Sequence, residues 1–324
     1  MAKSVEKRIR KLKKTKEYRV LSFIIFVLVA AIFYFFYQDQ NSTYTYSSSQ
    51  NDDGFYYYVE TTSLTDYYYE ANQLMGVQLE NKLSDIIHNN FQPVTYNDAR
   101  IYLAESDVSI SDPTKIYNIY DSKLVDDVWD GGTTWNREHV WPQSRLGNEE
   151  EVDGTDRNQA TDLHNLRAAT PVVNSTRNNR FFSAGSGDYS ITSNGGFYPG
   201  DEHIGDVARI LFYMVVMYDY LHLTNDLTDL LDESDNYSLD GADMGLLDTL
   251  LLWHRLDPVD AFERQRNEVI YSAQGNRNPF IDHPEYVHLI WEGKTISDLL
   301  PVTDQQNQAL DFIAILTESK RYEP

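Results

Sequence analysis

The sequence predicts a mixed α+β, helix-rich domain preceded by one N-terminal transmembrane helix. Three observations predict this architecture: an apolar run at residues 20–37, several later segments with apolar residues at helical spacing, and one short alternating segment at 133–142. The chain has 324 residues. Roughly 260 to 280 of them follow the targeting region, which is enough for one large or two modest domains.

The apolar run extends from Val20 to Tyr37, and Ser22 is its only clearly polar residue. Its 18 residues are just enough to cross a bilayer as a helix. The basic tail 1–19 belongs on the cytoplasmic side by the positive-inside rule. No small-residue cleavage site follows the run, so we expect a membrane anchor with an extracellular C-terminal domain. The alternative is a cleaved signal peptide and a secreted protein.

Residues 38–66 are rich in Ser, Thr, Tyr, Asn and Asp and show little apolar periodicity. This composition is typical of an extended linker that holds a domain away from the membrane. We therefore place the folded domain at 67–324.

The elements of this domain follow from local patterns. Apolar residues at helical spacing predict a helix over 71–90, and the alternating segment 133–142 predicts a strand that ends at Pro142. Thr170 followed by Pro171 is typical of a helix start, with an N-cap residue and proline at the first helical position.

The C-terminal half is expected to be mainly helical. The segment 205–221 has one apolar face and predicts an amphipathic helix, and 246–253 predicts another. A further helix is expected to begin at Asp257-Pro258. The acidic stretch 223–243 is expected to be a surface loop.

Charge and cysteine content exclude several classes of protein. The absence of cysteine excludes disulfides, thiolate metal sites and a cysteine nucleophile. The net charge is -23, and without the tail 1–19 it is -30. This argues against a nucleic-acid packaging protein, whose affinity comes from neutralising phosphates, but an enzyme needs only a local positive groove.

The cationic residues between positions 137 and 277 are all arginine, eleven in number. Arginine binds phosphate through a planar pair of donors, whereas lysine acts as a point charge. Ordinary ion pairing in an acidic protein is the alternative explanation.

The first motif with chemical potential is the segment 135–142, which contains Glu138 next to His139. Neighbouring residues on a strand face opposite sides, but at the end of a strand both can reach one site. Such a pair offers a hard oxygen ligand and a nitrogen that titrates near neutral pH. A histidine alone is more often a packed or surface residue.

A second motif runs from Asp162 to Arg167 and continues to Asn179. If a helix begins at Pro171, Asn174, Arg177 and Asn178 share one face, which would carry an oxygen ligand and a cation. A third motif covers 274–285, where Gly, Asn-Pro and His-Pro indicate an irregular loop. Its Asn276 and Arg277 could contact substrate or serve as structural hydrogen-bond partners.

These motifs, in this order, resemble the bacterial endonuclease I family of periplasmic and extracellular nucleases, which are ββα-metal (His-metal finger) endonucleases. The matching segments are 137–142, 162–179, the helix start at 205–209 and the loop 274–282. The resemblance covers roughly residues 67 to 291, and four motifs in family order are far more specific than one.

The resemblance implies a role for each matching residue. His139 takes the position of the general base, and Glu138 and Asn174 those of two ligands to a divalent metal. The metal is expected to be Mg²⁺, with Mn²⁺ or Ca²⁺ as alternatives. Arg177 and Arg167 are candidates for the contact to the leaving group. Other expected substrate contacts are Arg137, Asn179, Asn276 and Arg277.

We therefore expect a largely sequence-nonspecific endonuclease on DNA, RNA or both, leaving 5′-phosphate ends. Nucleic acid and, through 20–37, the membrane are the expected partners, and no obligate protein partner is expected. Activity is expected to fall below about pH 6 to 6.5, where an ordinary histidine becomes protonated. The alternatives are an inactive nucleic-acid-binding surface protein and a phosphodiesterase for small nucleotides.

Overall fold

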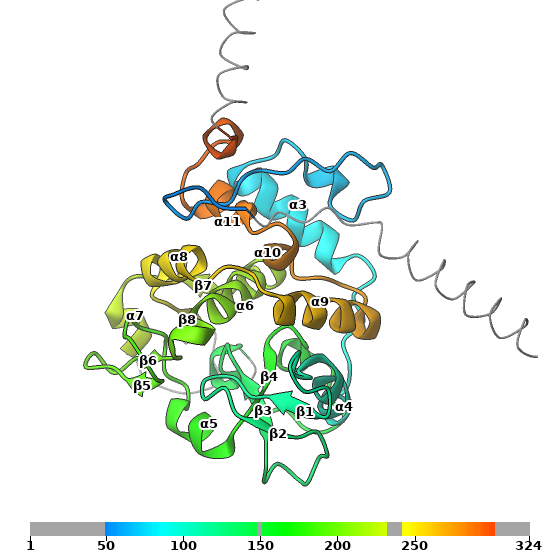
Figure 1. Ribbon diagram of the computed structural model, residues 1–324, viewed down its shortest axis with the longest axis vertical. Coiled ribbons are helices and arrows are strands. Elements are labelled where there is room, and N and C mark those ends of the chain that lie inside the picture. Colours follow the sequence, from blue (N-terminus) through cyan, green and yellow to red (C-terminus); the bar gives the residue numbers. More distant parts are fainter. Residues whose placement is uncertain (1–48, 148–150, 232–241, 302–324) are drawn as a thin grey trace, which may run out of the picture. The chain divides into compact units, whose positions relative to one another are not determined.

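The computed structural model describes residues 49–147, 151–231 and 242–301 (Figure 1). By their contacts these residues divide into a short unit, 61–69, and a large unit that holds the others. The tail 1–19 and the predicted membrane span 20–37 lie outside the described residues. None of the helices within the three described ranges is long and apolar enough to cross a membrane.

The large unit combines helices with short strands, as the sequence predicts. Its helices are α3 (Gly76–His88), α4 (Tyr96–Ser106), α5 (Pro171–Arg177), α6 (Ile204–Met217), α7 (Leu227–Leu231), α8 (Leu247–Leu256), α9 (Ala261–Gln274), α10 (Pro279–Asp282) and α11 (Glu285–Trp291). Its strands are β1 (Lys115–Tyr117), β2 (Leu124–Asp126), β3 (Asn136–His139), β4 (Leu166–Ala169), β5 (Ser190–Ile191), β6 (Phe197–Tyr198), β7 (His222–Leu223) and β8 (Asp243–Met244).

Across the described ranges the named strands pair only two at a time. The pairs β1–β2, β3–β4 and β5–β6 are antiparallel, whereas β7–β8 is parallel. Helices pack around these short ribbons: α6 contacts α8 and α3, and α4 contacts both α9 and β4 (Figure 1). The fold is therefore α+β and rich in helix.

Local sequence signals explain several helix boundaries. Thr95 caps α4, because its hydroxyl accepts a hydrogen bond from the Asp98 amide at 3.1 Å. Pro171 occupies the first turn of α5, as predicted, and Thr170 holds the N-cap position without a capping hydrogen bond from its side chain. In α3 the buried residues Leu79, Leu83 and Ile87 recur every four positions.

Helix α6 is more buried than an amphipathic helix. All of its residues except Val215 are buried, including Asp206 and Arg209, whose charges are paired. Gly205 permits a close approach at the start of this helix, since a Cβ there would lie 2.3 Å from the Asp257 carbonyl oxygen. The pattern of apolar residues indicated one face, but ion pairing allows the polar positions to be buried as well.

Several expectations about segment boundaries differ from the structure. The strand predicted over 133–142 is shorter, since β3 ends at His139 rather than at Pro142. Helix α9 begins at Ala261 rather than at Asp257-Pro258, because Asp260 and Glu263 form a capping box. The stretch 223–243 contains α7 and strand residues, and its positions 232–241 lie outside the described residues. Residues 49–60, expected within the linker, pack in the large unit, where Tyr56 is buried and its hydroxyl accepts from the Val259 amide.

A hydrophobic cluster supports the β3–β4 ribbon from one side. It joins residues beside or on the ribbon with residues of α4, α9 and β1, namely Val94, Ala99, Leu103, Ile116, Trp135, Leu163, Leu166, Ala168 and Ile270. The ribbon that carries the first two motifs is thus fixed to a packed core, which gives its polar side chains a defined position.

Candidate active site

A strand pair followed by a helix builds the candidate site. β3 pairs with β4 so that Glu138 lies opposite Arg167 and His139 opposite Leu166. α5 follows β4 directly and packs against β3. This β3–β4–α5 unit is the ββα arrangement that the resemblance implies.

A pocket of about 460 Å³ opens between the end of β3 and α5. It is lined by Arg137, Glu138, His139, Pro142, Gln143, Ser144, Glu151, Asn174, Ser175, Arg177, Asn178 and Asn179. The structure thus brings together six of the nine residues that the sequence selected, and Arg167, Asn276 and Arg277 are not among the lining residues.

The neighbouring residues Glu138 and His139 both reach this pocket because β3 ends at His139. Beyond it, Asn165 fixes the turn: its side-chain oxygen accepts from the Trp141 amide at 2.7 Å, and its Nδ2 donates to the Trp141 carbonyl. The strand geometry, in which neighbouring side chains face opposite sides, therefore ends after His139. This allows Glu138 and His139 to line the same pocket.

His139 is held in one tautomer by a backbone carbonyl. Its Nε2 donates to the Ala160 oxygen at 2.9 Å, which leaves Nδ1 as the hydrogen-bond acceptor. The side chain is only 8% exposed. Burial, together with the charges of Arg137 and Arg177, lowers the pKa of His139 to about 4 although the hydrogen bond to Ala160 raises it, so the ring is neutral at neutral pH.

Glu138 is a buried carboxylate with contacts on one oxygen. Its Oε1 accepts from the Tyr120 hydroxyl at 2.8 Å and lies 3.1 Å from the Arg177 guanidinium. Burial raises the pKa of Glu138 to about 7, although Arg177 and Tyr120 both favour the charged form. A divalent cation would favour the ionised carboxylate strongly at such a position.

The Asn174 amide is oriented by hydrogen bonds from its nitrogen. Nδ2 donates to Asn136 Oδ1 at 2.8 Å and to the Arg137 carbonyl at 3.3 Å. Within the described part of the chain, Asn174 Oδ1 and Glu138 Oε2 receive no hydrogen bond. One carboxylate oxygen and one amide oxygen in the same pocket fit the preference of Mg²⁺ for few, hard protein ligands.

The described residues contain no group of three or more His, Asp or Glu side chains placed to hold a metal. A site of one carboxylate and one amide is smaller than such a group. Of the acidic residues after the first motif, Glu151 lines the pocket, Asp153 is exposed and caps Thr155, and Glu149 and Glu150 lie outside the described residues.

Arg177 lines the pocket but directs its guanidinium at the protein. It is 1% exposed, and it donates to the carbonyl oxygens of His139, at 2.7 Å, and Val140. Together with its contact to Glu138, these bonds tie α5 to the end of β3.

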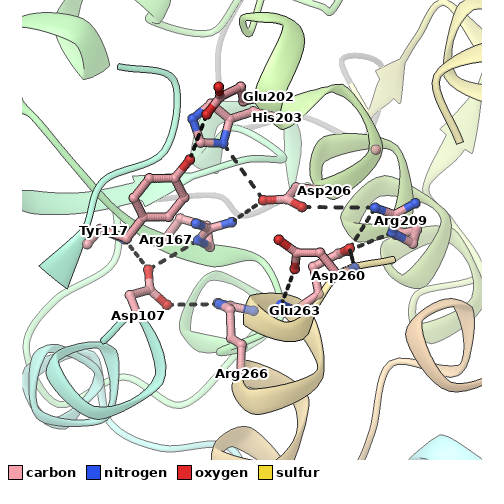
Figure 2. A network of polar contacts seen from close by, with 12 residues as sticks. Asp107, Tyr117, Arg167, Glu202, His203, Asp206, Arg209, Asp260, Glu263 and Arg266 are labelled. Carbon is pink, nitrogen blue, oxygen red and sulfur yellow. Dashed lines mark hydrogen bonds and ion pairs between the residues drawn. The ribbon is translucent and has the colours of Figure 1, made fainter. Parts of the chain in front are cut away.

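Arg167 does not line the pocket and belongs to a buried ion-pair network (Figure 2). Its Nε lies 3.1 Å from Asp107 and its Nη1 3.1 Å from Asp206. Asp107 also pairs with Arg266 at 2.9 Å, so this single carboxylate joins β4 and α9 at the end of α4.

Asn276 and Arg277 are also buried in the fold rather than placed in the pocket. Asn276 donates to the Tyr213 hydroxyl at 2.8 Å, and Arg277 pairs with Asp282 at 2.6 Å and with Glu268 at 2.8 Å. These contacts fix the conformation of the loop. Both residues therefore serve as structural hydrogen-bond partners, which was the second of the two expected alternatives.

Sequence patterns did not indicate some of the residues around the pocket. Tyr120 contacts Glu138 from 18 positions earlier in the chain, and no local motif marks it. Gln143 and Ser144 follow the first motif directly, and Ser175 lies within the second, so proximity in sequence was an available signal.

One protein family and two named relatives are similar to this chain. The family described as Endonuclease I matches residues 75–285, a range that includes the whole pocket. The protein named extracellular ribonuclease from Bacillus amyloliquefaciens is 40% identical over 234 residues, covering 69% of this chain and 78% of the relative. The protein of the same name from Bacillus subtilis (strain 168) is 39% identical over 237 residues, covering 70% and 79%.

Proposed function

The chain belongs to the endonuclease I family, and we propose that it is a metal-dependent endonuclease that hydrolyses phosphodiester bonds with His139 as the general base. The observation that carries the proposal is the pocket itself. It joins a neutral histidine of fixed tautomer, a buried carboxylate and a free amide oxygen.

Glu138 and Asn174 would hold the divalent metal, which we propose to be Mg²⁺, with Mn²⁺ or Ca²⁺ as substitutes. When bound, the cation would act as a Lewis acid that neutralises charge on the phosphate and on the leaving oxygen. The chain's contribution is to orient these two oxygens, through Tyr120 and Arg177 for Glu138 and through Asn136 for Asn174.

His139 would take a proton from the attacking water at Nδ1. The water oxygen forms the new bond to phosphorus, and the bond from phosphorus to the 3′ oxygen breaks. The 3′ oxygen takes a proton from solvent, which leaves a 5′-phosphate and a 3′-hydroxyl. The Ala160 carbonyl holds the Nε2 proton and favours the imidazolium that forms. General-base assistance of this kind is typically worth ~10²–10⁴ in rate.

The remaining candidate residues divide between substrate and scaffold. We propose that Arg137 and Asn179, which line the pocket, contact the substrate phosphates. We assign Arg177 to positioning Glu138 and the end of β3, and Arg167, Asn276 and Arg277 to the buried networks that support the site.

We propose RNA as a substrate because both relatives are named extracellular ribonuclease, and DNA remains to be compared with it. The same names support an extracellular position. The apolar run 20–37 supports an anchored form, which separation of membranes from culture medium would distinguish from a secreted one.

The test incubates the full-length chain with total RNA and with plasmid DNA, in Mg²⁺ or in EDTA, beside His139→Ala. His88→Ala is the matched control, because His88 is exposed on α3 and does not line the pocket. We expect metal-dependent cleavage that His139→Ala lowers by ~10²–10⁴ and the control leaves unchanged.

If the folded chain cleaves neither polymer with any divalent metal, the proposal fails. Cleavage of small phosphodiesters alone would favour the nucleotide phosphodiesterase. Binding of nucleic acid without cleavage would favour an inactive surface protein.

A further inference from the structure

Arg137 differs from the other arginines around the pocket in what surrounds it. Its guanidinium carbon lies 3.5 Å from the centre of the Tyr96 ring and 5.3 Å from that of Trp129. One terminal nitrogen donates to the Tyr96 carbonyl oxygen. Aromatic faces attract the cation and fix its plane, but they leave its other N–H donors available.

Arg137 has no carboxylate partner in the part of the chain that the structure describes. Within the described residues, neither Arg137 nor Arg100 has a carboxylate within ion-pair distance. By contrast Arg167, Arg177 and Arg266 each contact one. Arg145, Arg157 and Arg180 also have no carboxylate partner among the described residues, and they donate to backbone carbonyl oxygens. Arg137 differs from these three in lying over two aromatic rings at the pocket, where its other N–H donors are available to an external anion.

Arg100 extends this positive region along α4. It follows Tyr96 by four positions and therefore lies one helical turn further on the same face. Since the Arg137 guanidinium lies over the Tyr96 ring, Arg100 extends the positive charge from Arg137 along the same face of α4. A polyanion bound across both would be attracted by two positive charges.

We propose that Arg100 and Arg137, with Arg137 held by Tyr96 and Trp129, form a track for a backbone phosphate of a nucleic acid strand outside the cleavage position. The inference rests on the proposed function and refines its substrate class. A polymer extends beyond the pocket and can reach such a track, whereas a small nucleotide cannot. The track therefore favours a polymeric substrate.

Salt dependence of binding tests the track independently of cleavage. A fluorescent single-stranded 12-nucleotide oligonucleotide would be titrated with the full-length chain in EDTA, at a series of NaCl concentrations, and the Kd followed by anisotropy. Arg100→Gln is expected to weaken binding about fivefold. It should also reduce the slope of log Kd against log salt by about 0.7, the value for one released counterion on a single strand.

Lys115→Gln is the matched control. It removes one positive charge that is already paired with Asp126 at 2.5 Å, on a different element. It should leave the slope unchanged, and the basic tail 1–19 is common to all variants, so its contribution cancels. Arg100→Lys, which keeps the charge, should retain the slope and shows that a loss in Arg100→Gln is not due to misfolding.

An unchanged slope in Arg100→Gln would overturn the inference, as would an equal loss in Lys115→Gln. A chain that binds the oligonucleotide through Arg100 but cleaves no polymer with metal would refute the proposed function and leave the track standing. Cleavage of a polymer by the chain, together with an unchanged salt slope in Arg100→Gln, would support the proposed function and refute the track.

Discussion

At the scale of single residues, burial sets the chemistry of the pocket in two opposite directions. It raises the pKa of Glu138 to about 7 and lowers that of His139 to about 4. Groups whose pKa values are driven apart in this way are suited to different roles in one reaction. A bound cation would stabilise the charged form of the buried Glu138 carboxylate. The His139 imidazole is neutral and can accept a proton.

The lowered pKa of His139 changes the expected pH dependence. The unprotonated form is the active one, so lowering its pKa extends activity to lower pH, and activity is lost as pH falls through about 4. At saturating Mg²⁺, kcat/KM is therefore expected to be constant from pH 8 to about 5, unlike the expectation from an ordinary histidine. A loss between pH 6.5 and 5.5 at saturating metal, with the fold intact by circular dichroism, would contradict this.

Tyr120 is expected to act on metal affinity. Tyr120→Phe removes the hydrogen bond to Glu138 Oε1, and partners of metal ligands are typically worth about 10–100-fold in affinity. The Mg²⁺ concentration for half-maximal activity should rise by that factor, with kcat at saturating metal near the wild-type value. Tyr198→Phe removes a hydroxyl that contacts Asp201 instead and should change neither quantity.

At the scale of elements, the site depends on how β4, α4, α6 and α9 are joined (Figure 2). Asp107, at the end of α4, accepts from Arg167 on β4, from Arg266 on α9 and from the Ala168 amide. Arg209 on α6 pairs with Glu263 on α9 at 2.6 Å. Since β4 is the partner of β3, these ion pairs hold the strand that carries Glu138 and His139.

Asp107→Asn is expected to destabilise the fold by about 3–5 kcal/mol, because it leaves two buried guanidinium groups without their shared counter-charge. The midpoint of urea denaturation measures this. Asp112→Asn alters an exposed carboxylate that contacts Thr114 and should cost less than about 1 kcal/mol. Equal midpoints for the two variants would show that the network does not stabilise the fold.

At the scale of the whole molecule, charge is the dominant property. The chain carries a net charge of -23, and its acidic residues repel one another as well as a polyanionic substrate. Arginines that have no carboxylate partner within the described ranges, such as Arg100 and Arg137, would let such a protein approach nucleic acid at one place. Substrate binding and folding should therefore respond to salt in opposite directions.

Stability is expected to rise between 10 mM and 150 mM NaCl, because the screening length falls from about 30 Å to about 8 Å and self-repulsion weakens. A gain of about 1 kcal/mol would appear as an increase in Tm of about 2–4 °C for a domain of this size. A thermal melt at each salt concentration measures it. A Tm that falls over this range would mean that screened ion pairs outweigh the net repulsion.

The sequence by itself determined the family, the mixed helix-rich fold and six of the residues that line the pocket. These depend on local signals: helical spacing, caps, Pro171, and the adjacency of Glu138 to His139. The family match confirms the resemblance carried by four motifs. Local signals suffice there because the pocket is built from one ribbon and the helix that follows it.

Only the tertiary structure decided which arginines face the pocket and which are buried. Arg137, Arg167 and Arg277 look alike in sequence, yet the first lies over two aromatic rings at the pocket and the others are enclosed by carboxylates. Those carboxylates, and Tyr120 beside Glu138, come from distant parts of the chain. A long-range contact leaves no periodic or local pattern, because its position is fixed by how the elements pack and not by the residues next to it.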